Sequence, residues 1–498
     1  MEKRLSELLS YLPNDAILAV HGDAVITAPV VETDADVLAG GVFVARRGAS
    51  VDGHTFIPKA IERGAAAIVG ELDMQDLPVP YVQVRDARAI LGLLAAAFFD
   101  FPSRKLVVIG VTGTDGKTTT SHLLHSILKQ AAGIHPGLIS TIEADLGGAT
   151  VPTGLHVTTP GAPQVQSLLA QMVANGVTHC VLEMTSHGLA QGRLTGVDID
   201  VAVMTNVTHE HLDFHGSWEA YRDAKAIMFH MLKASQYKPD QPKVAVVNAD
   251  DRSSAHFAAI PADKTLLYGI ESEAEFRPEA IEYAPDATRF TVNGHQFAMH
   301  LVGEFNIYNA LAAIAAARGL GIDWQAIIAG VEAVRGVSGR MERIDEGQDF
   351  TAIVDFAHTP NALRRALEAG RTMLPEGGRL IAVFGSAGLR DVEKRRLMAE
   401  TSAQLADITV LTAEDPRTES LDDILQMMAD GCLAHNGVEG ETFFRIPDRG
   451  EAIYRACQMA KAGDIVMVCG KGHEQSMCFG TTEYPWDDRN ALRAALRG

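Results

Sequence analysis

The sequence has little cysteine and no long apolar run. Only five of its 498 residues are cysteine, at positions 180, 432, 457, 469 and 478, and none belongs to a CxxC pair. A disulfide framework or a structural zinc site is therefore not expected, and a reducing compartment fits. The longest apolar stretch, AILGLLAAAFF, is shorter than the roughly 20 residues that span a bilayer. The start, MEKRLSELLSYLPNDAILAV, lacks the continuous apolar segment of a signal peptide. We expect a soluble cytoplasmic protein without stable membrane insertion.

Basic residues are also in short supply. The chain has 43 lysines and arginines against 63 acidic residues, so its formal net charge is −20. An acidic surface repels nucleic acid and anionic lipid, which argues against both as partners. A small anionic ligand in a local basic pocket is still compatible with this charge. We expect a monomer whose partners are small molecules.

The alternation of apolar runs and helical spacing predicts an α/β protein of three domains. Short valine-rich runs such as LVVIGV, HCVLEM, VAVMTNV and KVAVVNADD are typical of buried parallel strands. Segments such as TTSHLLHSILKQ and PQVQSLLAQMVANG between them have the apolar spacing of helices. A second such series begins after GVSGRME, with TAIVDF, RLIAVFG, ITVLTAED and DIVMVCG. We expect domains over residues 1–102, 103–338 and 339–498.

Polar clusters follow these strands directly. They are TGTDGKTTT, EMTSHGLAQGR, TNVTHEHLDFHG, DFAHTPNAL, GSAGLRD, EDPR and GKGHE. In sheets of this type, ligands bind at the carboxyl ends of the strands. Seven clusters in the same relative position predict a shared site between domains.

The segment GVTGTDGKTTT, residues 110–120, has the context of a phosphate-binding loop. A strand precedes it and a helix follows, so free N–H groups and the positive end of the helix dipole would face an anion. The common form G-x-x-x-x-G-K-[ST] requires glycine where this chain has Val111. Lys117 can still reach the terminal phosphates, and Thr118 can offer its hydroxyl to Mg²⁺. Glu183 and His211, each after a strand, are the candidate metal ligands.

These segments, with YRDAK, GEFNIYNALAA and the amino-terminal GGVFVARRGASVDGHTFIPKAIERGAAAIV, resemble the Mur ligases. That family forms amide bonds at the expense of ATP in peptidoglycan synthesis, and its G-T-[ND]-G-K-T loop accounts for the unusual spacing. EDPR and GKGHE resemble the branch of UDP-N-acetylmuramoyl-tripeptide synthetases (MurE type). The resemblance implies a uridine-nucleotide-binding first domain, a central P-loop-type ATPase domain with a mainly parallel sheet, and a Rossmann-like third domain. The implied reaction adds a diamino acid to UDP-N-acetylmuramoyl-L-alanyl-D-glutamate through an acyl phosphate.

The resemblance also implies a role for each matched residue. Catalysis would depend on Lys117, Glu183, His211 and Lys225. ATP would be bound by Gly113, Thr114, Asp115, Gly116, Lys117, Thr118, Thr119, Asn306, Asn309, Arg340, Asp355 and His358. Mg²⁺ would be held by Thr118, Glu183, His211 and a carbamate that CO₂ forms on Lys225. The UDP-sugar dipeptide would contact Asp34, Thr158, Thr159, Thr185, Gln191 and Arg193. The diamino acid would contact Arg390, Glu414, Asp415, Arg417, Gly470 and Glu474.

The chain departs from the family pattern at three places. Thr33, Asp34 and Ala35 stand where the first domain usually has D-S-R, and Thr185 replaces a serine. The usual D-N-P-R of diaminopimelate enzymes is Glu414–Arg417 here, and Leu389 stands where aspartate is common. Arg417 favours diaminopimelate, because a guanidinium pairs with a carboxylate through two hydrogen bonds. Asp415 favours lysine or ornithine, because its charge would attract a terminal ammonium group and repel a carboxylate unless Arg417 pairs with it internally. Such a pair would cancel the signal of Arg417 and leave Glu414 for the ammonium group of lysine or ornithine. We expect meso-diaminopimelate, with L-lysine and L-ornithine as the alternatives.

Two further functions are compatible with parts of the sequence. A folylpolyglutamate-synthase-like ligase would share the ATP core, but residues 40–69 and GKGHE argue against it. A non-catalytic nucleotide-binding protein is the other alternative. The presence of Lys117, Glu183, His211 and Lys225 argues against that one.

Overall fold

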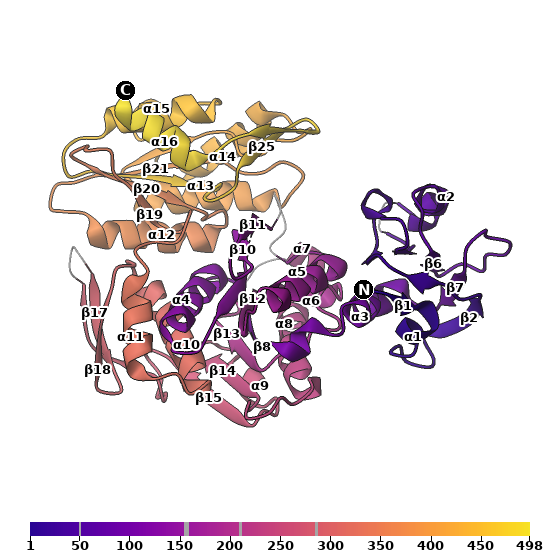
Figure 1. The fold of residues 1–498 in the computed structure, drawn as a ribbon. Helices are drawn as coiled ribbons and strands as arrows, with labels where there is room; N and C mark the ends of the chain where they lie inside the picture. The colour runs from indigo at the N-terminus through magenta and orange to yellow at the C-terminus, as the bar shows by residue number, and fades with distance from the viewer. Residues whose placement is uncertain (49–50, 154–158, 209–211, 284–286) are drawn as a thin grey trace. The chain divides into compact units, whose positions relative to one another are not determined.

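The computed structural model describes residues 1–48, 51–153, 159–208, 212–283 and 287–498, and the chain divides into two compact units. The first unit comprises Met1–Glu275 and Ala312–Ile327, and the second comprises Phe276–Leu311 and Ile328–Gly498. Strands and helices alternate in both units, which confirms the predicted α/β class (Figure 1). Helices α10 (Glu304–Gly319) and α11 (Trp324–Ala333) have residues in both units.

The first unit begins with a five-stranded sheet, counted over the described residues, in the order β2-β7-β6-β5-β4. Strands β4 to β7 are parallel, and β2 is antiparallel to β7. The amino-terminal segment GGVFVARRGASVDGHTFIPKAIERGAAAIV contains β5, α2 and part of β6. The strands are β2 (Ile17–His21), β4 (Val30–Val31), β5 (Val42–Val44), β6 (Ala67–Gly70) and β7 (Tyr81–Val84), and the helices are α1 (Leu5–Leu9), α2 (Ile57–Glu62) and α3 (Ala87–Phe98). Two short strands, β1 (Lys3–Arg4) and β3 (Val25–Ile26), form a separate antiparallel pair.

The same unit contains the central sheet, in the order β11-β10-β9-β12-β8-β13-β14-β15 among the described residues. The strands from β9 to β15 in this order are parallel to one another. At one end of the sheet, β10 is antiparallel to both of its neighbours, β9 and the edge strand β11. The strands are β8 (Val107–Thr112), β9 (Pro136–Ile139), β10 (Glu143–Asp145), β11 (Thr150–Pro152), β12 (His179–Glu183), β13 (Val201–Met204), β14 (Val244–Asn248) and β15 (Lys264–Tyr268). The helices are α4 (Lys117–Gln130), α5 (Ala162–Ala174), α6 (Ser186–Ala190), α7 (Leu212–His215), α8 (Trp218–Ala234) and α9 (Ser254–Ala258). The four valine-rich runs predicted as parallel strands are β8, β12, β13 and β14, and their side chains are almost all buried, as strands covered on both faces require.

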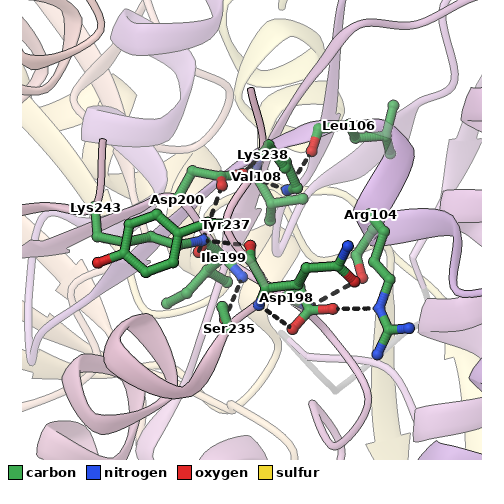
Figure 2. A network of polar contacts seen from close by, with 12 residues as sticks. Arg104, Leu106, Val108, Asp198, Ile199, Asp200, Ser235, Tyr237, Lys238 and Lys243 are labelled. Carbon is green, nitrogen blue, oxygen red and sulfur yellow. Dashed lines mark hydrogen bonds and ion pairs between the residues drawn. The ribbon is translucent and has the colours of Figure 1, made fainter. Parts of the chain in front are cut away.

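A buried charge cluster ties together the amino ends of these central strands. Asp200, immediately before β13, is fully buried and pairs with Lys243 at 3.0 Å and with Lys238. The same carboxylate accepts a hydrogen bond from the Val108 N–H of β8 at 2.8 Å. Figure 2 shows the two lysines converging on Asp200, beside the half-buried pair of Asp198 and Arg104. The cluster lies at the amino ends of the strands, whereas the phosphate loop follows the carboxyl end of β8, so we assign the cluster a structural role.

The second unit is built on a sheet in the order β19-β20-β24-β21-β22-β23, as far as the described residues extend. Only β19 is antiparallel to its neighbour. The strands are β19 (Glu342–Ile344), β20 (Thr351–Asp355), β21 (Leu380–Phe384), β22 (Ile408–Leu411), β23 (Phe443–Arg445) and β24 (Ile465–Cys469). The helices are α12 (Pro360–Met373), α13 (Glu393–Leu405), α14 (Leu421–Ala434), α15 (Arg449–Met459) and α16 (Asp488–Arg497). All four strands that the sequence predicted for this region are present, as β20, β21, β22 and β24.

Two antiparallel elements of the second unit were not predicted. One is the meander β16 (Pro278–Tyr283), β17 (Thr288–Val292) and β18 (His295–Met299). The other is the hairpin β25 (Ser476–Phe479) and β26 (Thr482–Pro485). Buried and partly buried side chains alternate in β17, whereas the hairpin joins a mostly buried β25 to an exposed β26. Both elements lack the continuous valine runs that mark the parallel strands.

Over the described residues, no helix combines the length and the apolar character that crossing a membrane requires.

Candidate active site

The phosphate loop connects β8 directly to α4. β8 continues through Thr112, so Val111 is a buried strand residue and the loop proper spans only Gly113–Gly116. A Cβ at Gly113 would collide with the Thr205 hydroxyl, and Gly116 has a φ of +82°, which favours glycine. The loop is thus tighter than the common form, and this explains why no glycine is needed at position 111.

Lys117 is the first residue of α4, and its side chain folds back over the loop. Its ammonium group donates to the carbonyls of Gly113 at 3.1 Å and of Thr114 at 2.8 Å. The N–H groups of the first turn of α4 point out of the helix end, where the positive end of the helix dipole favours an anion. The loop therefore presents a cation and a helix N-terminus at the same point.

Thr118 and Glu183 are brought together by the pairing of β8 with β12. The Thr118 hydroxyl lies 3.0 Å and 3.2 Å from the two carboxylate oxygens of Glu183, whose side chain is almost completely buried. Thr141, after β9, donates to the same carboxylate through its N–H at 2.9 Å and its hydroxyl at 3.0 Å. Thr141 was not predicted, although it is one of two polar residues directly after a strand.

Lys225 is buried, in contrast to the solvated position that its helix alone would suggest. It lies on α8 with 1% of its surface exposed, and its ammonium group donates to the Gly113 carbonyl at 2.6 Å. The same group lies 4.2 Å from the centre of the Tyr221 ring. The structure therefore brings Lys225 to the phosphate loop, and its proposed role as a metal ligand stays a prediction.

Two predicted residues, His211 and Thr158, lie outside the described residues. Within the described part of the chain, no group of three or more histidine, cysteine, aspartate or glutamate side chains could hold a metal ion. Thr118 and Glu183 alone supply two adjacent oxygen ligands, the type that Mg²⁺ prefers. The described residues thus fit part of a magnesium site.

Four of the residues predicted to contact the sugar peptide form one hydrogen-bonded group beside β12. The hydroxyls of Thr159 and Thr185 are 3.0 Å apart, and Thr185 caps α6 by accepting from Gly188 N–H. Arg193 donates to the Thr159 carbonyl at 2.7 Å and to the Gln191 amide oxygen at 2.7 Å. Asp34 lies apart from this group, in a 3₁₀ turn (Asp34–Asp36) of the N-terminal sheet, where its carbonyl accepts from Arg63.

The residues predicted for the adenosine side belong to the second unit and form two groups. On α10, the Asn309 amide donates to Asn306 Oδ1 at 2.9 Å, and both side chains are buried. The other group surrounds Phe356: Arg340 lies 4.4 Å from the centre of its ring, and His358 contacts its carbonyl at 2.9 Å. Asp355 fixes the adjacent turns by accepting from the N–H groups of Met341 and Ala357.

The residues predicted for the amino acid lie mainly in the loops after β21, β22 and β24. Asp415 accepts two bonds of 3.0 Å from the buried ammonium group of Lys471, and Lys471 also pairs with Glu474 at 2.6 Å. Arg417 donates to the Gly388 carbonyl at 3.3 Å. Asp415 thus has Lys471 as its cationic partner. Lys471 belongs to the GKGHE segment, and no role was predicted for it. Arg390 is exposed in the loop after β21.

Glu414 occupies the most enclosed position in these loops. Its carboxylate packs under Gly470, whose added Cβ would collide with Glu414 Oε2, and that oxygen is buried without a hydrogen-bond partner. Burial raises the pKa of Glu414 to about 7, against the opposing effects of Lys394, Arg449 and Lys471. The group therefore titrates near neutral pH.

Comparisons with known proteins agree with this arrangement. The Mur ligase middle domain matches residues 111–317, the Mur ligase glutamate ligase domain matches 339–472, and the Mur ligase family catalytic domain matches 35–99. A UDP-N-acetylmuramyl-tripeptide synthetase from Roseiflexus sp. (strain RS-1) is 43% identical over 99% of this chain and 98% of its own. A UDP-N-acetylmuramoyl-L-alanyl-D-glutamate–2,6-diaminopimelate ligase from Bacillus licheniformis is 39% identical over 99% of both chains. A solved structure of a ligase of the same name is 31% identical, covers 94% of both chains and has a TM-score of 0.63. The chain therefore belongs to the Mur ligase family of ATP-dependent, amide-bond-forming ligases.

Proposed function

We propose that this protein joins a diamino acid to UDP-N-acetylmuramoyl-L-alanyl-D-glutamate and cleaves ATP to ADP and phosphate. The observation that carries the proposal is similarity along the whole chain, at 43% and 39% identity, to relatives named for this step of peptidoglycan synthesis. Each of those matches spans 99% of the chain, so it includes the N-terminal sheet as well as the ATP-binding core. A folylpolyglutamate-synthase-like activity would not require the N-terminal part.

The chemistry requires activation of a carboxylate, because oxide is a poor leaving group. The substrate carboxylate attacks the γ-phosphorus of ATP, ADP leaves, and the resulting acyl phosphate is attacked by the amine. Lys117 and the first-turn N–H groups of α4 would stabilise the negative charge that spreads over the phosphate oxygens. Thr114, Asp115 and Thr119 would complete the phosphate side of the site. Asn306, Asn309, Arg340, Asp355 and His358 would bind adenosine.

Thr118 and Glu183 would hold Mg²⁺, together with His211 and a carbamate on Lys225. The bound ion would neutralise phosphate charge. A free ammonium group repels a cation, whereas a carbamate is an anion that can bind one. The support for this role is the position of Lys225, buried and 2.6 Å from the loop carbonyl of Gly113.

We propose meso-diaminopimelate as the amino acid, in preference to L-lysine or L-ornithine. Lys471 already compensates the charge of Asp415, so an Asp415–Arg417 pair is not needed to neutralise it. Arg417 is then available for the distal carboxylate that only diaminopimelate carries. Arg390, Glu414, Gly470 and Glu474 would surround the same ligand, while Thr158, Thr159, Thr185, Gln191, Arg193 and Asp34 would bind the uridine substrate.

We also propose the domain limits 1–102 for the uridine domain, 103–338 for the ATP domain and 339–498 for the amino-acid domain. We place the activity in the cytoplasm, because the substrates are ATP and a uridine nucleotide, and we propose a monomer.

The test is a ligation assay with ATP, the uridine-linked dipeptide and each of the three diamino acids in turn. We expect ADP release that requires both the dipeptide and an amino acid, with diaminopimelate the best substrate. ADP release with a folate substrate, or none with any diamino acid, would contradict the proposal.

A further inference from the structure

The segment Thr205–Thr208 lies directly against the phosphate loop. It follows β13, which pairs in parallel with β8 so that Met204 lies opposite Thr112. The carboxyl ends of the two strands therefore meet, and the segment after one strand faces the loop after the other. No residue of Thr205–Thr208 has a role in the proposed reaction as described above.

Asn206 makes three hydrogen bonds to the loop. Its Oδ1 accepts from the Asp115 N–H at 3.0 Å, and its Nδ2 donates to the Asp115 carbonyl at 3.1 Å. Its own carbonyl accepts from the Thr114 N–H at 2.8 Å. The side-chain amide thus binds Asp115 as a neighbouring strand would, through one donor and one acceptor. The side chains of asparagine and glutamine carry such a donor and acceptor side by side on one planar amide.

Thr205 and Thr208 support the same loop residues. The Thr205 hydroxyl donates to the Asp115 carbonyl at 2.6 Å, and the Thr208 N–H donates to the Thr114 hydroxyl at 3.0 Å. With the N–H groups of Thr114 and Asp115 bound by Asn206, the groups left to face a phosphate are those at the start of α4, from Gly116 onward. The hydrogen bonds from Thr205, Asn206 and Thr208 therefore determine which N–H groups of the loop the ligand meets.

The segment itself is held from behind by β14 and β15. Asn248 donates to the Thr205 carbonyl at 2.8 Å, and the Tyr268 hydroxyl lies 3.0 Å from the Met204 carbonyl. Asp251 accepts from the Val207 N–H at 2.7 Å. Asn206 is thus presented by a segment that is anchored independently of the loop.

We infer that Asn206 is a positioning residue for ATP, whose side-chain amide holds the loop main chain so that the start of α4 and Lys117 face the phosphates. The inference goes beyond the proposed function in assigning this residue, and it rests on that function only for the identity of the nucleotide. Asn206 touches the loop and not the reacting atoms, so its effect should be on nucleotide affinity more than on binding of the other substrates.

Three variants of the full chain test the inference. Asn206→Ala removes both bonds of the amide, and Asn206→Asp keeps the shape and the acceptor but loses the donor and adds a negative charge. Asn175→Ala is the matched control, because Asn175 makes one bond of 2.9 Å, to the Leu146 carbonyl, elsewhere in the same unit. ADP affinity by calorimetry, KM for ATP and for the uridine substrate, kcat, and the thermal midpoint are measured for each.

We expect Asn206→Ala to weaken ADP binding and to raise KM for ATP by about 10-fold or more, the scale of one to two lost hydrogen bonds. Asn206→Asp should bind ADP more weakly still, because its carboxylate would repel the Asp115 carbonyl and add negative charge beside the phosphate loop. KM for the uridine substrate should stay near its wild-type value, and Asn175→Ala should bind ADP normally. Wild-type ADP affinity in Asn206→Ala would overturn the inference. Equal rises in KM for ATP and for the uridine substrate, together with a lower thermal midpoint, would overturn it too. If the wild type ligates no diamino acid, the proposed function fails, but the ADP affinities still decide the role of Asn206.

Discussion

At the scale of single residues, Lys225 has the most unusual environment in the ATP site. Its ammonium group is almost fully buried, donates to the Gly113 carbonyl at 2.6 Å and lies 4.2 Å from the centre of the Tyr221 ring. This position brings the group to the phosphate loop, where the proposed carbamate would serve as a metal ligand.

Lys225→Ala should abolish ligation, because the proposed metal site loses an anionic ligand. Small carboxylates such as acetate should restore part of the activity by filling the space that the side chain leaves. The measurement is the ligation rate with and without added carboxylate, with Lys129→Ala, an exposed lysine on α4, as the control. Normal activity in Lys225→Ala would exclude the role.

Arg417→Ala should selectively weaken the use of diaminopimelate. If Arg417 pairs with the distal carboxylate, its loss should cost about 1.5–3 kcal/mol in kcat/KM, the scale of a charged hydrogen bond. Ligation of lysine, which lacks that carboxylate, should change little. Efficient use of lysine or ornithine by the wild type, with diaminopimelate ignored, would refute the assignment of Arg417.

Glu414 should make the folded state less stable as the pH rises. Its pKa is about 7 in the folded protein and 4.5 as the ordinary value, so between these pH values the unfolded state binds fewer protons. The stabilisation that protonated Glu414 gives the folded state is therefore complete below about pH 4.5 and lost by about pH 7. By linkage, this loss lowers the free energy of unfolding by about 3 kcal/mol. The side chain of Glu414→Gln cannot titrate. Between pH 4.5 and 8, the free energy of unfolding of this variant should therefore rise relative to that of the wild type by about the same amount, as measured by urea unfolding.

The control for Glu414 is Glu376→Gln, an exposed glutamate in a turn of the same unit. Its unfolding free energy should follow the wild-type curve across the whole pH range. A constant difference between wild type and Glu414→Gln at all pH values would show that Glu414 keeps an ordinary pKa.

At the scale of elements, the strands and the loops differ in how far sequence predicts them. The parallel strands with valine-rich runs, such as β13 and β14, were predicted because burial on both faces favours such runs. The parallel strands β9, β15 and β23 lack such runs and were not predicted. The antiparallel strand β10 and the meander β16–β18 were not predicted either, because they also lack that pattern. Lys117, Thr118 and Glu183 were identified from motifs, but Asn206 was not. Its partner Asp115 is 91 residues away, and only the pairing of β8 with β13 joins them.

The charge cluster at the amino ends of the central strands gives a stability prediction. Asp200→Ala would leave Lys238 and Lys243 buried without their carboxylate. Such a loss should lower the free energy of unfolding by about 3–5 kcal/mol. KM for ATP in the remaining folded protein should be unchanged, because the phosphate loop lies at the opposite ends of the strands. Urea unfolding and ATP kinetics check the two parts.

Asp198→Ala is the matched control for Asp200, because Asp198 belongs to the same network and pairs with the partly exposed Arg104 (Figure 2). Water reaches this half-buried ion pair and screens its charges, so the control should lose far less stability than Asp200→Ala. Equal losses in the two variants would mean that burial of the charges is not what matters.

At the scale of the whole molecule, the three predicted α/β regions correspond to three main sheets. The first two lie in one compact unit and the third in the other. Three of the polar clusters follow strands of the central sheet, and four follow strands of the C-terminal sheet. Whether the two sets form one site depends on how the units meet during the reaction. That arrangement stays a prediction, because periodicity and motifs report on single elements.

The central claim is that the chain transfers the γ-phosphoryl group of ATP to a substrate carboxylate before the amide bond forms. The most direct measurement uses uridine-linked dipeptide labelled with ¹⁸O in the D-glutamate side-chain carboxylate, with ATP and diaminopimelate, and analyses the released phosphate by mass spectrometry. The account predicts that each turnover transfers one carboxylate oxygen to inorganic phosphate, because that oxygen attacks phosphorus and then leaves with it. Unlabelled phosphate formed together with the amide product, or label in AMP, would contradict the account.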